Sequence, residues 1–131
     1  MTTPITPASK QLDLPQEAYR LQRAGRSTEA AAKFHDAYET SHDDSWLFEE
    51  AKEWRQAKRW GEAMTTYNLL LGEGEKMLAH GMPLSVFVMV RGAKLSADLH
   101  DFVKEYPQEA AFEIAKRFDE MLALDKLKGS H

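Results

Sequence analysis

Histidine is the side chain best suited to acid–base and metal chemistry near neutral pH, and this chain contains five histidines. None of them stands in the HExxH spacing, which places two imidazoles and a carboxylate on one face of a helix. His35 and His42 are seven positions apart, or about two helical turns, so they are placed to meet on one side of a helix. Solvated or partly buried histidines account for this pair more simply than a metal site, and we expect no bound metal.

Two further histidines, His80 and His100, have carboxylates within helical reach. Glu75 lies near the first and Asp101 lies next to the second, and we interpret both acids as ordinary surface residues. The glycines at 72–75 do not form a phosphate loop, because two glutamates stand where a phosphate needs bare N–H groups and a cation. The chain has no cysteine, which excludes a thiolate metal site and a cysteine nucleophile. We therefore expect a protein that is not an enzyme and needs no cofactor.

The aliphatic composition indicates which elements position these side chains. Alanine and leucine occur 17 and 14 times, whereas valine and isoleucine occur only 4 and 2 times. Alanine and leucine favour helices, and strands favour the β-branched residues that are scarce here. The composition therefore predicts an all-α protein.

Proline and glycine mark the predicted ends of the helices. Pro15, Pro83 and Pro107 stand where helices begin, because the missing N–H of proline costs nothing in a first turn. Gly25 and Gly81 stand where helices end, because glycine tolerates the left-handed conformation found there. The predicted helices cover residues 15–24, 27–41, 45–57, 60–80, 84–104 and 108–127. Since the connections are short, these helices should form three antiparallel hairpins.

The length of 131 residues and the mass of 14.9 kDa correspond to one domain. We expect a flexible arm at residues 1–11, one helical domain at 12–128 and a remnant of an expression tag at 129–131. The net charge of −4 argues against binding to nucleic acid. No signal sequence is visible, and the longest apolar run, Val86–Val90, is far shorter than the roughly 18 residues of a membrane span. We expect a cytoplasmic protein that binds neither nucleic acid nor membranes.

An offset of 33 residues aligns two parts of the chain. The identical pairs are Glu17 and Glu50, Ala18 and Ala51, Ala24 and Ala57, Arg26 and Arg59, Glu29 and Glu62, and Ala30 and Ala63. Leu14 also aligns with Leu47, and Phe34 with Tyr67. Small residues recur where two helices must approach closely, and aromatic residues recur where a gap between hairpins must be filled. The pattern predicts two stacked copies of one helical hairpin.

On these positions, residues 11–76 resemble two tetratricopeptide repeats, which are helix–turn–helix motifs of about 34 residues. The matching residues are Ala18, Leu21, Gly25, Ala30, Phe34 and Ala37 in the first copy, and Ala51, Trp54, Trp60, Ala63 and Tyr67 in the second. The chain departs from the motif at Ser27, where an aromatic residue is usual, at Lys58, where glycine is usual, and near His42, where proline is common. The resemblance implies an αα-hairpin solenoid that binds protein or peptide segments, as adaptors, secretion chaperones and assembly factors do.

The resemblance also implies where a peptide would bind, because the first helix of each repeat lines the concave side of such solenoids. The candidate peptide-binding residues are Tyr19, Gln22 and Arg23 in the first copy, and Lys52, Arg55 and Gln56 in the second. Cations and amide donors suit the carbonyl groups and acidic side chains of an extended peptide. A solvated polar face, which every amphipathic helix has, is the alternative. The Lys and Asn with which some tetratricopeptide domains clamp a carboxyl-terminal acid are replaced here by Pro15 and Tyr19.

Residues 84–127 form a third hairpin that does not continue the repeat, and we expect it to cap the stack. In the helix before it, Gly72 and Gly74 each cost about 1 kcal/mol relative to alanine, which predicts a bend or a break. The residues of the third hairpin predicted to face inward are Phe112, Ala115, Phe118, Met121 and Leu122.

The run Val86–Val90 is apolar on every side of a helix, so more than one of its faces must be covered. A central position between neighbouring helices explains the run without an interface, and a buried strand is disfavoured because no partner strand is found. The functional interpretation is a subunit or partner interface through Val86, Phe87, Met89 and Val90. Two alternatives to peptide binding therefore stay open. One is a structural homo-oligomer, such as a homodimer, built through the helix at 84–103, and the other is an accessory helical domain of an enzyme system.

Overall fold

The computed structural model describes residues 7–82 and 86–128, and side chains at 14–82 and 95–128. The helices are α1 (Pro7–Arg23), α2 (Ser27–Ser41), α3 (Ser45–Gln56), α4 (Trp60–Ala79), α5 (Val86–Glu105) and α6 (Glu109–Lys128). No strand occurs in the two described stretches, and the predicted all-α class is confirmed. Of the helices in this part of the chain, none combines the length and the apolar character needed to cross a bilayer.

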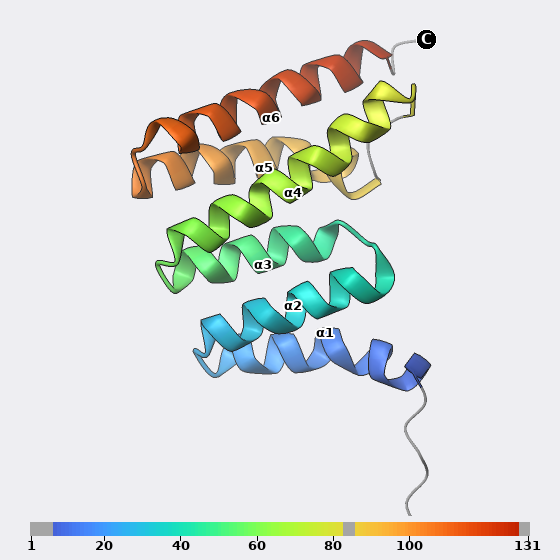
Figure 1. Ribbon diagram of the computed structural model, residues 1–131, viewed down its shortest axis with the longest axis vertical. Helices are drawn as coiled ribbons and strands as arrows, with labels where there is room; N and C mark the ends of the chain where they lie inside the picture. The colour runs from blue at the N-terminus through green and yellow to red at the C-terminus, as the bar shows by residue number, and fades with distance from the viewer. Residues whose placement is uncertain (1–6, 83–85, 129–131) are drawn as a thin grey trace, which may run out of the picture.

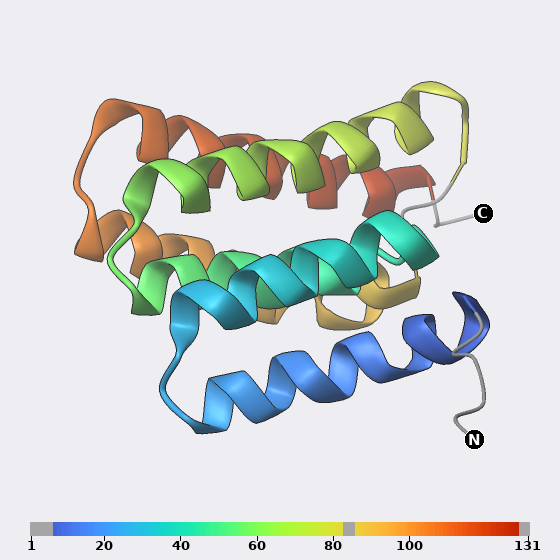
Figure 2. The same cartoon turned by 60° about the horizontal axis from the view of Figure 1, so that its bottom comes forward.

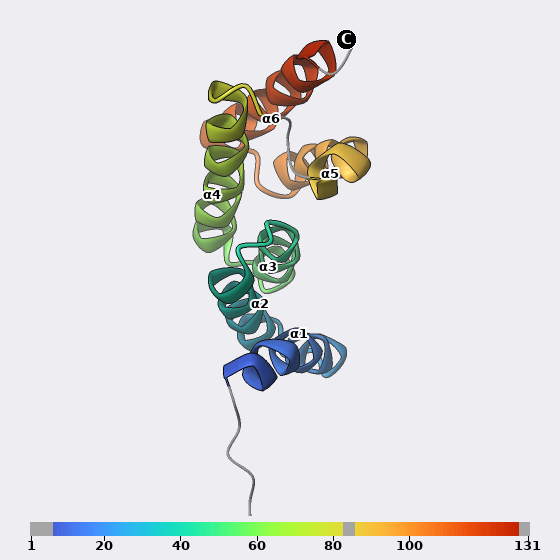
Figure 3. The ribbon, with the colours of Figure 1, turned by 90° about the vertical axis from the view of Figure 1, so that its right-hand side faces the viewer.

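The six helices stack in chain order, so that α1 and α6 lie at opposite ends of the long axis (Figure 1). Seen from the side, α1, α3 and α5 form one layer, and α2, α4 and α6 form the other (Figure 3). The turned view shows α4 beside α6, with α1 at the far edge of the stack (Figure 2). The three hairpin turns lie on one side of the molecule, at the left of Figure 1. The carboxyl-terminal ends of α1, α3 and α5 are therefore neighbours.

The turns that follow α1 and α3 are built alike. In both turns, two N–H groups beyond the helix donate to carbonyl groups of its last turn, which satisfies acceptors that the helix leaves open. These bonds join Arg26 to Leu21 (2.9 Å) and Gly25 to Gln22 (3.0 Å) after α1, and Arg59 to Trp54 (2.8 Å) and Lys58 to Arg55 (2.9 Å) after α3. Gly25 and Lys58 both take left-handed backbone angles, with φ of 76° and 58°. The repeat of 33 residues is confirmed at these two turns.

Aromatic rings fill the larger core, which joins α3, α4, α5 and α6. Phe102 of α5 is fully buried at its centre. Its ring centroid lies 5.3 Å from that of Tyr67, 6.2 Å from that of Trp60 and 6.1 Å from that of Tyr106. Large buried rings contribute strongly to core stability, so this cluster holds the third hairpin to the second.

Helix α1 begins at Pro7, whereas the sequence analysis placed its start at Pro15. Residues 7–11, which belong to the predicted flexible arm, are thus helical. Proline is favoured in a first turn because its missing N–H needs no partner there. Pro15 instead lies inside the helix, where it removes one backbone hydrogen bond. The choice of Pro15 as the first residue was wrong.

Helix α4 is continuous from Trp60 to Ala79, so a break at Gly72 and Gly74 is wrong. Buried leucines flank the two glycines, and their packing outweighs the weak helix propensity of glycine. These leucines are Leu70, Leu71 and Leu78.

The buried stripe of α6 begins one residue earlier than predicted. Ala111 is buried, whereas Phe112 is 52% exposed, so the prediction that Phe112 faces inward is wrong. Ala111 precedes Ala115 and Phe118 by one and two helical turns and therefore continues their face of the helix. Ala115, Phe118 and Met121 are buried as predicted, and Leu122 is partly buried against them.

Replacing Phe102 with alanine should lower the free energy of unfolding by about 3–5 kcal/mol, because the change empties a fully buried site among aromatic rings. The matched variant Phe112→Ala should lower it by less than about 1 kcal/mol, because this ring is half exposed. Urea unfolding followed by far-ultraviolet circular dichroism measures both values. Equal losses in the two variants would contradict the core described above.

Candidate peptide-binding site

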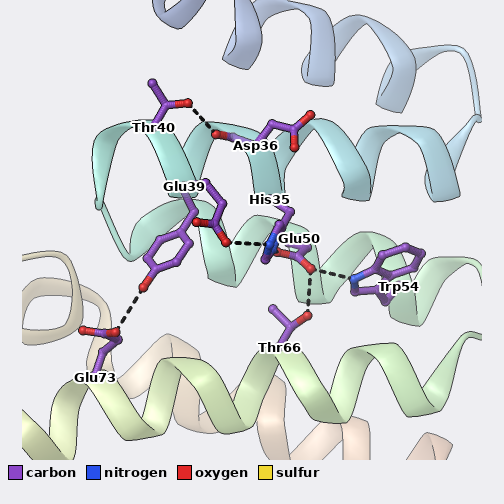
Figure 4. Close-up of polar contacts among 9 residues, drawn as sticks. His35, Asp36, Glu39, Thr40, Glu50, Trp54, Thr66 and Glu73 are labelled. Carbon is purple, nitrogen blue, oxygen red and sulfur yellow. Dashed lines mark hydrogen bonds and ion pairs between the residues drawn. The ribbon is translucent and has the colours of Figure 1, made fainter.

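The buried carboxylate of Glu50 fixes the rotation of α3, the helix that carries three of the six predicted binding residues. Glu50 is only 4% exposed. It accepts hydrogen bonds from Nδ1 of His35 on α2 (2.8 Å), Nε1 of Trp54 on α3 (2.8 Å) and Oγ1 of Thr66 on α4 (2.9 Å) (Figure 4). An anion taken out of water is costly unless such donors replace the water. Glu50 therefore joins three helices at one point.

The imidazole of His35 lies between two carboxylates. Its Nδ1 faces Glu50 at 2.8 Å, and its Nε2 faces Glu39 of the same helix at 3.0 Å (Figure 4). Burial lowers the pKa of His35, but the hydrogen bonds and charges of Glu50 and Glu39 outweigh burial and raise this pKa above its ordinary value of 6.5. Both ring nitrogens donate only in the imidazolium form, so the cation matches both acceptors.

Two of the predicted residues on α1 connect this helix to its neighbours. The ring of Tyr19 packs against Phe34 and Trp46, with centroid distances of 5.2 and 6.2 Å, and so belongs to the smaller core cluster. The side-chain amide of Gln22 donates to Oε2 of Glu53 on α3 at 2.8 Å. Both side chains therefore have partners within the fold.

The guanidinium of Arg55 is also paired within the fold. It makes two hydrogen bonds to Glu105 of α5 (3.0 and 2.9 Å), contacts the hydroxyl of Tyr67 at 3.3 Å and lies 5.8 Å from the ring centroid of Phe102. The side chain of Arg55 is 12% exposed. Burial lowers the pKa of Arg55, but these partners outweigh it and raise the pKa above its ordinary value. Arg55 ties α3 to α5.

Two hollows lie side by side near the carboxyl-terminal ends of α1, α3 and α5. The α3–α5 hollow has a volume of about 600 Å³, and its lining includes Lys52, Arg55, Gln56, Lys58, Asp98 and Glu105. The α1–α3 hollow has a volume of about 430 Å³, and its lining includes Gln22, Ser27, Thr28, Glu53 and Gln56. Because Gln56 lines both hollows, they adjoin across α3, and we refer to the two together as the groove.

Lys52 and Lys58 supply the open positive charge of the α3–α5 hollow. The ammonium group of Lys52 lies 5.4 Å from the ring centroid of Phe48, one turn earlier on α3. Within the described stretches, neither lysine forms an ion pair. The hollow therefore offers two ammonium groups to an acceptor, in contrast to Arg55, whose donors already bond to Glu105.

The groove brings together four of the six predicted residues, namely Gln22, Lys52, Arg55 and Gln56. The other two, Tyr19 and Arg23, line a separate depression of about 650 Å³ on α1. The sequence analysis also missed Glu53, because an acid on a polar helix face looks solvated and Arg20 stands at its position in the first copy. Asp98 was missed because it lies in the third hairpin, outside the repeat.

The predicted interface residues Val86, Phe87, Met89 and Val90 belong to the first turns of α5. Their side chains lie outside the described residues, and the homo-oligomer built through this helix stays a prediction.

A Ser/His/Asp group that sequence spacing did not reveal connects α5 to α6. The hydroxyl of Ser96 donates to Oδ1 of Asp119 (2.5 Å), and Nε2 of His100 lies 2.9 Å from Oδ2 of Asp119. The carboxylate stands between the other two groups, whereas activation of a serine nucleophile needs the imidazole in the middle. No cluster of three or more metal-ligating side chains occurs among the residues that the structure describes.

We expect His35 to stabilise the fold at low pH. Because its pKa is higher in the folded than in the unfolded chain, its contribution is fully present below the unfolded value of about 6.5 and is lost as the pH rises through the folded value. The difference in unfolding free energy between wild type and His35→Gln should therefore shrink as the pH rises above about 6.5. Urea unfolding at several pH values measures this difference.

The variant Glu39→Gln provides the matched control for this experiment. It removes one of the two carboxylates at His35, so the pH-dependent contribution should become smaller but should not vanish while Glu50 remains. A wild-type advantage over His35→Gln that grows with pH would contradict the assignment.

The groove is thus lined mainly by α1, α3 and α5, with Ser27 and Thr28 of α2 at its rim. The hydrogen bonds of Glu50 to α2 and α4 fix the rotation of α3, which carries part of this lining. Comparisons with protein-family models, with curated proteins and with solved structures found no match to this chain.

Proposed function

We propose that the chain is a non-catalytic module that binds an extended protein or peptide segment in the groove across α1, α3 and α5. The observation that carries the proposal is that the two hollows adjoin at Gln56. Neighbouring packed helices lie about 8–10 Å apart, and an extended chain advances about 3.3–3.6 Å per residue. About six residues of a partner would therefore fill both hollows.

The chemistry of the α3–α5 hollow favours an acidic group in that segment. Lys52 and Lys58 offer ammonium donors, which bond best to carboxylates and can also serve backbone carbonyl groups. The amide of Gln56 offers both a donor and an acceptor to a passing backbone. Arg55 and Glu105 neutralise each other, so the charge of this hollow is that of Lys52 and Lys58 against Asp98, which leaves it positive.

The resemblance of residues 11–76 to tetratricopeptide repeats supports the same proposal. The recurring turns and the two-layer stack are what such a solenoid requires, and its first helices would line the binding side. An adaptor, chaperone or assembly factor of the cytoplasm is the role that we propose on this basis.

The test is the double charge reversal Lys52→Glu with Lys58→Glu. A phage-displayed library of random peptides of about ten residues, longer than the groove needs, should yield binders to the wild-type protein. The double variant should bind them at least about tenfold more weakly, because repulsion replaces attraction for acidic groups. Fluorescence polarisation with labelled peptides measures the affinities, and circular dichroism checks that the variant is folded.

The matched control is Lys76→Glu with Lys116→Glu. Both of these lysines are exposed on α4 and α6, neither lines the groove, and the change in net charge is the same. Binding should be retained in this variant. A library without binders to the wild type, or equal losses in both double variants, would overturn the proposal.

A further inference from the structure

Helix α3 carries two buried glutamates, one turn apart, whose surroundings differ. Glu50 and Glu53 are 4% and 5% exposed. Glu50 accepts hydrogen bonds from three side chains on three helices. Among the described residues, Glu53 accepts a side-chain hydrogen bond only from the amide of Gln22. The protein therefore supplies the donors that Glu50 needs, but only one for Glu53.

Glu53 lines the α1–α3 hollow. A carboxylate can accept about four hydrogen bonds, so the bond from Gln22 leaves part of the capacity of Glu53 unused. The α1–α3 hollow that Glu53 lines also contains Ser27, Thr28 and Gln56, whose hydroxyl and amide oxygens are further acceptors. Of its described lining side chains, none is a cation. An anion surrounded by neutral acceptors attracts a positively charged donor.

We propose that the α1–α3 hollow is a subsite for a lysine or arginine side chain of the bound segment. The ammonium or guanidinium group would bond to the carboxylate of Glu53, and the hydroxyl and amide oxygens at the rim would accept its remaining N–H groups. This inference rests on the proposed function, because the cation belongs to the segment that lies in the groove.

The two hollows together specify a spacing of charges in that segment. The α3–α5 hollow, with Lys52 and Lys58, selects an acid, and the α1–α3 hollow, with Glu53, selects a base. The two lie on either side of α3, so their centres are separated by about one helix spacing of 8–10 Å. At about 3.3–3.6 Å per residue, the acid and the base of the segment are about three residues apart.

The variant Glu53→Gln isolates this subsite. Its carbonyl oxygen can still accept the hydrogen bond from Gln22, so the contact between α1 and α3 is kept while the negative charge is removed. Glu49→Gln is the matched control, because Glu49 lies on the same helix, is partly exposed and lines neither hollow.

The experiment is a double-mutant cycle on the tightest peptide from the library described above. We expect that peptide to carry a lysine or arginine about three residues from an acid. Replacing this base with glutamine should weaken binding at least about tenfold on the wild type and on Glu49→Gln, but less than about twofold on Glu53→Gln. Isothermal titration calorimetry measures the affinities of the original and the substituted peptide for each of the three proteins, and circular dichroism checks the fold of each variant.

Two outcomes would overturn the inference while leaving the proposed function in place. One is a set of tight binders without a base near the acid, and the other is an equal loss from the base substitution on the wild type and on Glu53→Gln. A library that yields no binder to the wild type would overturn both proposals.

Discussion

The fold depends on one buried negative charge. Glu50 is only 4% exposed, and a buried carboxylate is destabilising unless hydrogen-bond donors replace the water that it loses. The donors come from α2, α3 and α4, so the charge is satisfied only when these helices meet at one distance and one rotation. A rotation of α3 by one residue would break the bonds to His35 and Thr66, whereas the bond to Trp54 lies within α3. The direction in which α3 presents its other side chains to α1 and α5 follows from this requirement.

Most of the fold could be predicted from the sequence, because its signals are local. The composition predicts the helical class, Gly25 marks the end of a helix, and the six identical pairs of the repeat recur at a fixed offset. The predicted bounds of the helices from α2 onward agree with the structure to within two residues. The errors at Pro15, Gly72 and Gly74 share one cause. Local preferences were weighed there without the tertiary packing that overrides them.

The site was harder to predict, because its decisive contacts join residues far apart in the chain. Arg55 looked like a free cation until Glu105, fifty positions later, was found to pair with it. Glu53 looked like a solvated acid until α1 was found to cover it through Gln22. Helical spacing shows which residues share a face, but it does not show which other helix covers that face. A charged side chain that another helix covers has a partner within the fold, so knowing which helix covers it is needed to tell a structural charge from one open to a ligand.

Lys58 occupies, in the second copy of the repeat, the left-handed position that Gly25 occupies in the first. A side chain with a β-carbon is disfavoured in this conformation by roughly 1 kcal/mol or more relative to glycine. The turn after α3 is therefore less stable than it would be with glycine at position 58, and Lys58 places a positive charge at the edge of the groove. The two turns therefore share their hydrogen bonds but differ in the residue at the left-handed position: the first has glycine, which favours that conformation, and the second has a cation that the proposed binding would use.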